Sequence, residues 1–298
     1  MEQIIRSILH QALGADIHTI QEIIGLGIVN QVFDIQSSRG DYILRLNEES
    51  NKLIEYKKER WCLQQVRQLG IPSADVYGLG VYEERPFMIQ QKLPGVNGKE
   101  CSRAEQARIW KQLGSYAAQF CQIHQVDDPE VEKNVLHRSW KQRLLYNLGE
   151  FHDKDRLLRK GIFSRKEYVQ AEAALSILLA SNFRSGLTHG DLCPRNVLVH
   201  GDTIYLLDWG TAEINIAPHS EIGILSLSEE ASREAFHLFL EGYGLSPAAY
   251  QEIEKELRLI NFLHRLDKYR WAEDRDIPTI HEYELKVRQT FEAIEGVG

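Results

Sequence analysis

Residues 189–210 read HGDLCPRNVLVHGDTIYLLDWG. Within this stretch, two short apolar runs flank Gly201 and Asp202 in the segment 197–207. A glycine-first pair between apolar runs is typical of a β-hairpin turn. The tripeptide His-Gly-Asp occurs twice, and only the second copy lies in this turn, where Gly201 supplies turn backbone and Asp202 a turn side chain. The second copy is therefore predicted to fold the chain back and to carry no chemistry.

The predicted hairpin brings three oxygen-bearing side chains to one end. Asp191 precedes the first strand, Asn196 lies at its entrance, and Asp208 follows the second strand. Oxygen ligands with few protein contacts suit Mg²⁺, which takes its remaining ligands from water and substrate phosphates. One carboxylate is then left to orient or deprotonate a hydroxyl. This is the arrangement that phosphoryl transfer needs, because that reaction depends mainly on positioning and charge neutralisation.

The order H-x-D, four residues, Asn and then D-x-G is also the order of the kinase signature motifs. HGDLCPRNVLV followed by LLDWG resembles the aminoglycoside phosphotransferase and choline kinase group of the protein-kinase-like fold, with Gly between His and Asp and with Trp in the D-x-G motif. The resemblance implies that Asp191 is the catalytic base and that Asn196 and Asp208 are ligands of Mg²⁺. It also implies that His189 holds the loop and that ATP is the phosphate donor.

The rest of the chain fits a bilobal α+β fold. After a short amphipathic helix at about 3–13, strand-like runs and one charged helix fill the first third: 20–26, 30–36, 41–47, the helix 51–70, 76–82 and 86–93. Beyond residue 103 the pattern is helical except for the hairpin. With the resemblance, this predicts a protein-kinase-like fold with an antiparallel-sheet nucleotide-binding lobe at 1–93 and a helical lobe at 94–298, which holds the catalytic loop and the acceptor site.

The stretch IIGLGIVNQVFDI is the candidate phosphate-covering turn. Gly25 and Gly27 permit close approach of the backbone to phosphate. Asn30 replaces the third glycine of the protein-kinase loop, and the resemblance implies that G-x-x-N does the same work. The strand 41–47 presents Arg45 where protein kinases have Lys, and Arg binds phosphate bidentately.

Two glutamates compete as ion-pair partner of Arg45. Glu59 on the following helix is the choice, and Glu55, one turn earlier, is the alternative.

The segment PFMIQQKLPG resembles the strand and hinge that receive adenine. The resemblance implies that backbone groups of Gln91 and Leu93 bind the base and that Met88 or Ile89 forms its apolar wall.

Further features favour a small molecule over a protein as the phosphate acceptor. Cys193 stands where kinases of Ser and Thr carry Lys, and no long activation segment ending in A-P-E is present. Arg195 stands where the group has a small residue, so it either reaches the γ-phosphate or points to solvent. The motif P-x-x-E-I-G at 218–223 resembles P-x-x-D-L-A of the group, which implies that Glu221 anchors the catalytic loop.

The acceptor is left open among an aminoglycoside, an amino alcohol and a sugar-like molecule. Glu213 and the segment 267–276 offer acids and aromatic rings, but the segment also carries basic residues and reads equally as a mixed-charge helix surface. A catalytically silent nucleotide-binding protein and a nucleotidyl transferase are the alternatives. The oligomeric state and a choice between ATP and GTP do not follow from the sequence.

Composition excludes several other classes of protein. The formal net charge of −8 repels nucleic-acid phosphates. The first residues lack the apolar core of a signal peptide, and the longest apolar run, at 173–180, is too short for a membrane span. The four scattered cysteines lack the spacing of a zinc site or a disulfide framework. We expect a cytoplasmic protein with reduced thiols and with no nucleic-acid or membrane partner.

Overall fold

The chain forms two compact units in a computed structural model that describes residues 1–24, 30–135 and 140–295. Each unit is assembled from three segments. Unit 1 contains 1–112, 125–135 and 193–212, and unit 2 contains 113–124, 136–192 and 213–298. Pro94, where the predicted lobes divide, lies inside unit 1, and the division into lobes at that position remains a prediction.

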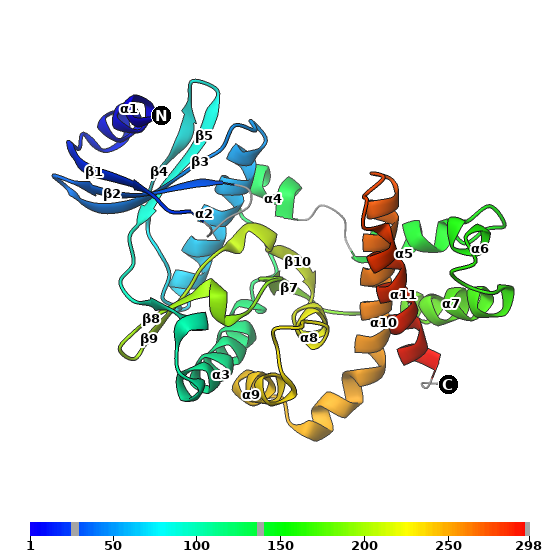
Figure 1. Cartoon of the computed structure of the whole chain (residues 1–298). Coiled ribbons are helices and arrows are strands. Elements are labelled where there is room, and N and C mark those ends of the chain that lie inside the picture. Colours follow the sequence, from blue (N-terminus) through cyan, green and yellow to red (C-terminus); the bar gives the residue numbers. More distant parts are fainter. Residues whose placement is uncertain (25–29, 136–139, 296–298) are drawn as a thin grey trace. The chain divides into compact units, whose positions relative to one another are not determined.

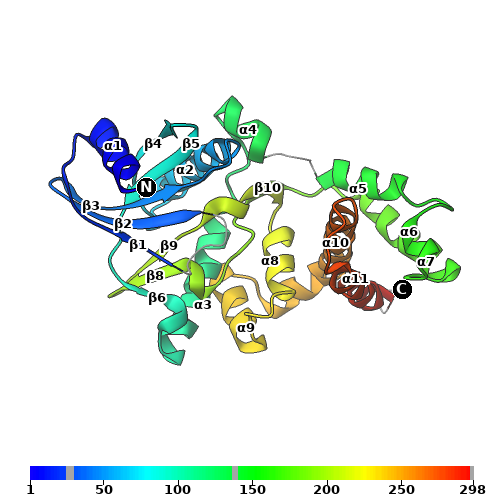
Figure 2. The same ribbon diagram turned by 45° about the horizontal axis from the view of Figure 1, so that its top comes forward.

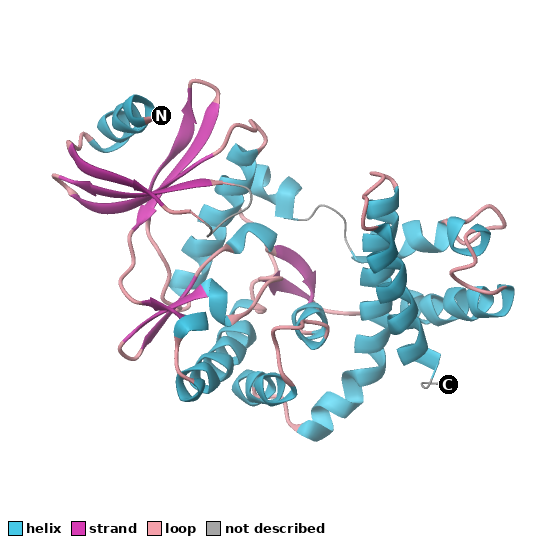
Figure 3. Cartoon of the chain, viewed as in Figure 1, coloured by secondary structure: helices cyan, strands magenta, loops and turns pink. Residues whose placement is uncertain are grey.

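Unit 1 contains a five-stranded antiparallel sheet with the strand order β1-β2-β3-β5-β4, drawn in magenta in Figure 3. Its strands are β1 (Ile17–Glu22), β2 (Gln31–Ser37), β3 (Gly40–Leu46), β4 (Val76–Tyr82) and β5 (Arg85–Gln91). The predicted antiparallel sheet is confirmed. β1 begins earlier than expected and ends at Glu22, because its pairing with β2 runs from Ile17 to Glu22 and selects this register.

Two helices flank this sheet, α1 (Glu2–Leu13) and α2 (Lys52–Gln68) (Figure 1). Alternate residues of a strand point to opposite faces. Leu44 and Leu46 of β3 pack with Ile8 of α1 in one buried cluster. Arg45 lies between these leucines, so it points to the other face, which α2 covers. The sheet therefore separates an apolar core under α1 from a face that carries charge.

The predicted hairpin is present in unit 1. β8 (Val197–His200) and β9 (Thr203–Leu206) pair antiparallel, with Val197 opposite Leu206, and β6 (Val96–Asn97) adds a third strand on the side of β8. Gly201 has a φ of +58°, a left-handed conformation that glycine adopts without the steric cost of a side chain. The turn thus uses the second His-Gly-Asp copy as predicted.

Helices dominate unit 2, as Figure 2 shows for α5, α7, α10 and α11. The helices after the N-terminal sheet are α3 (Arg103–Phe120), which runs through both units, α4 (Pro129–Val135) in unit 1, and α5 (Trp140–Gly149), α6 (Arg156–Arg159), α7 (Arg165–Ile177), α8 (His219–Ser226), α9 (Arg233–Tyr243), α10 (Pro247–Glu273) and α11 (Ile280–Glu295). Phe262 of α10 and Phe291 of α11 pack in the main buried cluster of this unit, with their ring centroids 5.8 Å apart.

One feature of unit 2 corrects the expectation of a purely helical region outside the hairpin. β7 (Ser185–Thr188) and β10 (Glu213–Ile216) form a two-stranded antiparallel sheet, with Thr188 opposite Glu213. Both strands are only four residues long, which is too short for an alternating pattern to stand out.

All four cysteines are free thiols, as expected. Among the described residues, no helix combines the length and the apolarity that a membrane span requires.

Candidate active site

The predicted ion pair between Arg45 and Glu59 is present in unit 1. Arg45 Nη1 donates to both carboxylate oxygens of Glu59, at 2.7 and 2.8 Å. The Glu59 side chain is 3% exposed and the Arg45 side chain 16%, so water competes weakly for this pair. Glu55, the alternative partner, instead accepts a hydrogen bond from Lys52 at 2.7 Å. The buried face of α2 therefore selects Glu59.

The charge on Arg45 is held in place by several neighbours. Burial lowers its pKa, but the nearby Glu59 carboxylate, the Tyr56 hydroxyl and the Asp208 carboxylate outweigh burial and raise it. The guanidinium carbon lies 5.4 Å from the centroid of the Tyr56 ring. Arg45 consequently stays cationic. The carboxylate of Asp208, in the D-x-G motif, is near enough to raise the Arg45 pKa by its charge.

Asn196 and Asp208 both lie at the base of the hairpin. The N–H of Leu207 donates to the Asn196 carbonyl at 2.9 Å. Asp208 is the next residue after Leu207, so this bond holds its backbone close to that of Asn196. Asp208 has a φ of 57°, which is in the left-handed region. The ammonium of Lys58 on α2 donates to the Gly210 carbonyl at 2.6 Å and so holds the turn after Asp208. One amide and one carboxylate therefore come from adjacent strand ends, and oxygen atoms of both kinds are ligands that suit Mg²⁺.

Asn30 is held by neighbours in unit 1. Its Oδ1 accepts hydrogen bonds from Asn47 Nδ2 and from the Tyr56 hydroxyl, each at 2.9 Å. The side chain thus fixes the start of β2 against the end of β3 and against α2. Gly25 and Gly27, the predicted phosphate-covering glycines, lie outside the described residues.

The predicted hinge follows the end of β5. The N–H of Gln91 donates to the Asp75 carbonyl at 2.8 Å, and Gln91 Oε1 accepts from the Asp75 N–H at 3.4 Å. An adenine base could use the Gln91 N–H only by displacing the first of these bonds. Leu93 lies two residues beyond the strand, partly buried.

The register of the sheet distinguishes the two candidates for the apolar wall. Met88 lies directly opposite Arg45 on the paired strand, so both side chains are on the same face. Ile89 instead belongs to the cluster under α1. Both residues are fully buried. Of the two candidates, Met88 is therefore the one that shares a face with the ion pair.

The loop that carries Asp191 is anchored within unit 2. Glu221, in the first turn of α8, accepts the His189 N–H at 2.5 Å and the Gly190 N–H at 3.3 Å. The Asp191 N–H in turn donates to His189 Nδ1 at 3.3 Å. The predicted anchoring by Glu221 is confirmed, and His189, fully buried, holds the loop from inside.

Burial makes Glu221 a weaker acid than an ordinary glutamate. It raises the pKa of this carboxyl to about 7, although the N–H groups of His189 and Gly190 act to lower it. The negative charges of Asp191 and Glu213 raise it further. Two neighbouring acids thus add to the effect of burial on Glu221.

Glu213 has a partner that the sequence did not reveal. Arg143 of α5 donates to its two carboxylate oxygens, at 2.6 and 3.3 Å, across 70 positions of sequence. Asn215 Nδ2 also donates to Glu213, at 2.5 Å. The position of Glu213 follows from the strand pairing that places it opposite Thr188, three residues before Asp191. No sequence signal marked Arg143, because its pairing depends on the packing of α5.

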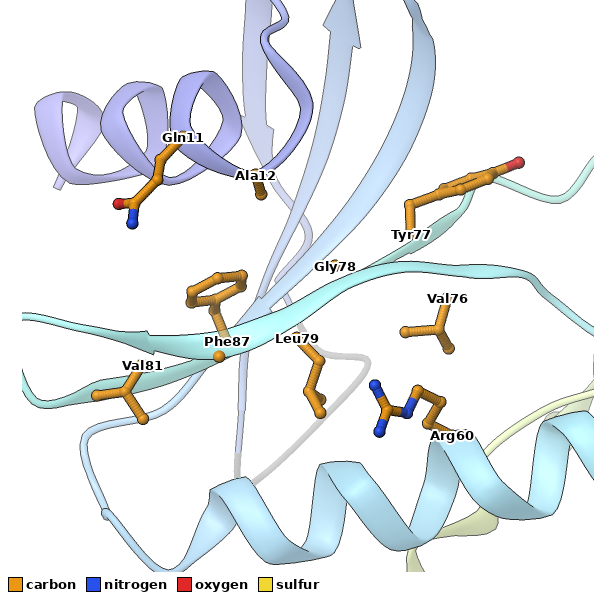
Figure 4. Close-up of a pocket in the computed structure, with 10 residues that line it drawn as sticks. Gln11, Ala12, Arg60, Val76, Tyr77, Gly78, Leu79, Val81 and Phe87 are labelled. Atoms are coloured by element: carbon orange, nitrogen blue, oxygen red, sulfur yellow. The ribbon is translucent and has the colours of Figure 1, made fainter.

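A cavity in unit 1 lies away from these residues. It runs along β4, between Gln11 and Ala12 of α1 and Arg60 of α2, as Figure 4 shows. Of the residues predicted to bind the nucleotide, those that the structure describes do not line it.

Comparison with known proteins places the chain among phosphate-transferring enzymes. A model of the phosphotransferase enzyme family matches residues 20–259. A search of curated proteins found no significant match.

Three similar solved structures illustrate the fold that these proteins share. The GDP and kanamycin complex of APH(2″)-IIia is 14% identical with a TM-score of 0.67, and the match covers 96% of this chain and 97% of that one. Spectinomycin phosphotransferase APH(9)-Ia, in complex with ADP and spectinomycin, is 16% identical with a TM-score of 0.60 and coverages of 99% and 93%. Macrolide 2′-phosphotransferase MphH from Brachybacterium faecium is 20% identical with a TM-score of 0.59 and coverages of 95% and 97%.

Proposed function

Because this chain belongs to the phosphotransferase enzyme family, we propose that it is a Mg²⁺-dependent kinase that transfers the γ-phosphate of ATP to a hydroxyl group of a small molecule. The observation that carries the proposal is the buried ion pair of Arg45 and Glu59. The pKa of Arg45 is also raised by the nearby carboxylate of Asp208. A phosphate-binding cation, the acid that holds it and a metal-binding aspartate are the parts that a kinase combines.

In this proposal, unit 1 binds the nucleotide. Arg45 contacts the phosphates, and Glu59 fixes its orientation. Met88 lies against the base on the same face. Gln91 and Leu93 offer backbone groups to the base. Asn30, which is bonded to Asn47 and Tyr56, supports the predicted phosphate-covering turn that contains Gly27.

Asp191 acts as the catalytic base. The acceptor hydroxyl gives its proton to the Asp191 carboxylate as its oxygen forms a bond to the γ-phosphorus. The bond from that phosphorus to the bridging oxygen breaks, and the electron pair leaves on ADP. Glu221 contributes by holding the backbone of the loop, so that Asp191 needs little reorganisation before the reaction.

Asn196 and Asp208 would hold Mg²⁺, which when bound neutralises charge on the donor phosphates. Their shared placement at the hairpin base supports this assignment.

The similar structures also support a nucleotide-dependent reaction on a small molecule. One holds GDP with kanamycin, and another holds ADP with spectinomycin. Both ligand pairs are bound by those two proteins.

The test is a transfer assay with ATP labelled at either the γ or the α position. The purified protein is incubated with Mg²⁺ and a panel of amino sugars, amino alcohols, nucleosides and sugars. We expect γ-label in one acceptor class and release of ADP. Transfer of α-label would identify a nucleotidyl transferase instead. Binding of ATP without any transfer across the panel would identify a catalytically silent protein.

A further inference from the structure

Unit 2 contains a pocket built from the same elements that hold the catalytic loop. Its lining comes from α5, β10, α8 and α10: Trp140, Arg143, Asn215, Ile216, Ser220, Ile224, Ile260, Asn261, Leu263, His264 and Asp267. Ser220 immediately precedes Glu221, whose carboxylate binds the loop backbone. β10 pairs with β7, which leads directly into His189. The pocket therefore adjoins the loop that presents Asp191, in one compact unit.

Asp267 lines this pocket, and Glu213 lies behind its wall, bonded to the lining residues Arg143 and Asn215. Arg143 donates to Glu213 at 2.6 Å, and the charge of Asp267 also raises the Arg143 pKa, although burial acts to lower it. Asp267 additionally accepts a hydrogen bond from Asn147 Nδ2 at 3.1 Å. An ammonium group entering here would have to compete with a fixed guanidinium for both carboxylates.

The pKa of His264 shows that this pocket disfavours a positive charge. Burial lowers its pKa to about 3, helped by the cations Lys268, Arg265 and Arg143. The imidazole is therefore neutral at physiological pH. An ammonium group of a ligand placed beside it would lose hydration and meet the same three cations, so it would be disfavoured for the same reasons.

The same histidine offers uncharged hydrogen bonding. Within the described part of the chain, no group hydrogen-bonds to the ring of His264 or to the hydroxyl of Ser220. A neutral imidazole provides one donor and one acceptor, which match a ligand hydroxyl. Ser220 is 5% exposed, so its hydroxyl would gain a partner when the pocket fills.

The apolar part of the pocket provides a wall for a ring. Trp140 is fixed edge-on by Phe183, with 5.1 Å between ring centroids. Lys141 Nζ lies 5.5 Å from the centroid of the Trp140 ring, so this ring already has one cation of the chain beside it. Ile216 and Ile260 add aliphatic surface.

Resting on the proposed phosphotransferase activity, we infer that this pocket binds the acceptor and selects an uncharged, hydroxylated ring compound over an amine-bearing cation. The ring packs on Trp140 and the isoleucines, and hydroxyl groups bond to His264 and Ser220.

The inference is tested by equilibrium binding without nucleotide, measured by ligand-observed NMR on the full-length protein. The probes are matched pairs that differ in one amine: glucose and glucosamine, galactose and galactosamine, cyclohexanol and cyclohexylamine. We expect at least one neutral member to bind, and to bind at least tenfold more tightly than its amine. Equal or tighter binding of the amines overturns the inference, as does the absence of binding by every neutral member.

Two substitutions locate the binding. His264→Leu removes the donor and acceptor and should weaken the neutral probe roughly five- to tenfold, whereas His264→Gln keeps uncharged hydrogen bonding and should retain most of the affinity. The control is His237→Leu on α9, an exposed histidine outside the pocket, which should leave binding unchanged. Equal affinity of His264→Leu and wild type would overturn the assignment. Because no phosphate transfer is measured, failure of the proposed activity would leave these results standing. Transfer to kanamycin with no neutral probe bound would instead retain the activity and reject the inference.

Discussion

Glu221→Gln should make unit 2 more stable at alkaline pH. The carboxylate is 2% exposed and accepts N–H groups from His189 and Gly190. Burial raises its pKa from an ordinary value of 4.5 to about 7, so the folded protein resists ionisation of this group. A glutamine oxygen in the place of Oε2 can accept the same two N–H groups, while the ionisation is removed.

The sign of the effect follows from proton linkage. A carboxyl with a raised pKa binds more protons in the folded state than in the unfolded state between pH 4.5 and about 7. Its contribution to stability is present below pH 4.5 and is lost as the pH rises through about 7. At about 1.4 kcal/mol per pH unit, the loss at pH 8 has an upper bound of about 3 kcal/mol. Glu221→Gln escapes this loss.

The assay is urea unfolding followed by tryptophan fluorescence, at pH 5 and pH 8. Relative to wild type, the free energy of unfolding of Glu221→Gln should rise by about 1–3 kcal/mol more at pH 8 than at pH 5. Glu252→Gln, on the exposed side of α10, is the matched control and should show no such pH-dependent gain. A Glu221→Gln variant that follows wild type at both pH values, or loses stability at pH 8, would refute the reasoning.

Three further outcomes are expected. Arg45→Met leaves the Glu59 carboxylate buried without its cation and should lower the free energy of unfolding by about 3–5 kcal/mol, measured in urea; an unchanged value would contradict the buried pair. Asp202→Asn changes only a turn side chain, so kcat/KM in the transfer assay should stay within about twofold of wild type; a large loss would mean that the second His-Gly-Asp copy has a catalytic role. Gly186→Ala would drive a Cβ into the carbonyl of Cys121 and should lower the free energy of unfolding by about 1–3 kcal/mol, seen as a melting temperature several degrees lower. An unchanged melting temperature would contradict this close packing.

Much of unit 1 was predictable because its signals are local. The hairpin follows from two apolar runs around a glycine-first turn, and these runs pair as β8 and β9. The Arg45–Glu59 pair needs only a strand cation and a helix that follows it. The choice of Glu59 over Glu55 was harder, because both are acids on one charged helix and only packing shows which face is buried.

The parts that sequence reasoning missed depend on contacts between distant segments. β7 and β10 are four residues each, and Thr188 meets Glu213 across 25 positions. Arg143 reaches Glu213 from a helix that carries no motif. The sequence left Glu213 as an acid that could attract a cationic acceptor. Its ion pair with Arg143 removes that reason for expecting one.

The measurement that tests the proposed function most directly compares wild type with Asp191→Asn, using γ-labelled ATP and the best acceptor of the panel. Nucleotide binding is measured in parallel. Asp191 lies in unit 2, whereas Arg45 and the residues proposed to bind the base lie in unit 1, so the substitution should leave nucleotide binding intact. Loss of the base should reduce transfer by about 10²–10⁴-fold while ATP affinity is retained. Unchanged transfer by Asp191→Asn would contradict the assignment of this aspartate as the base.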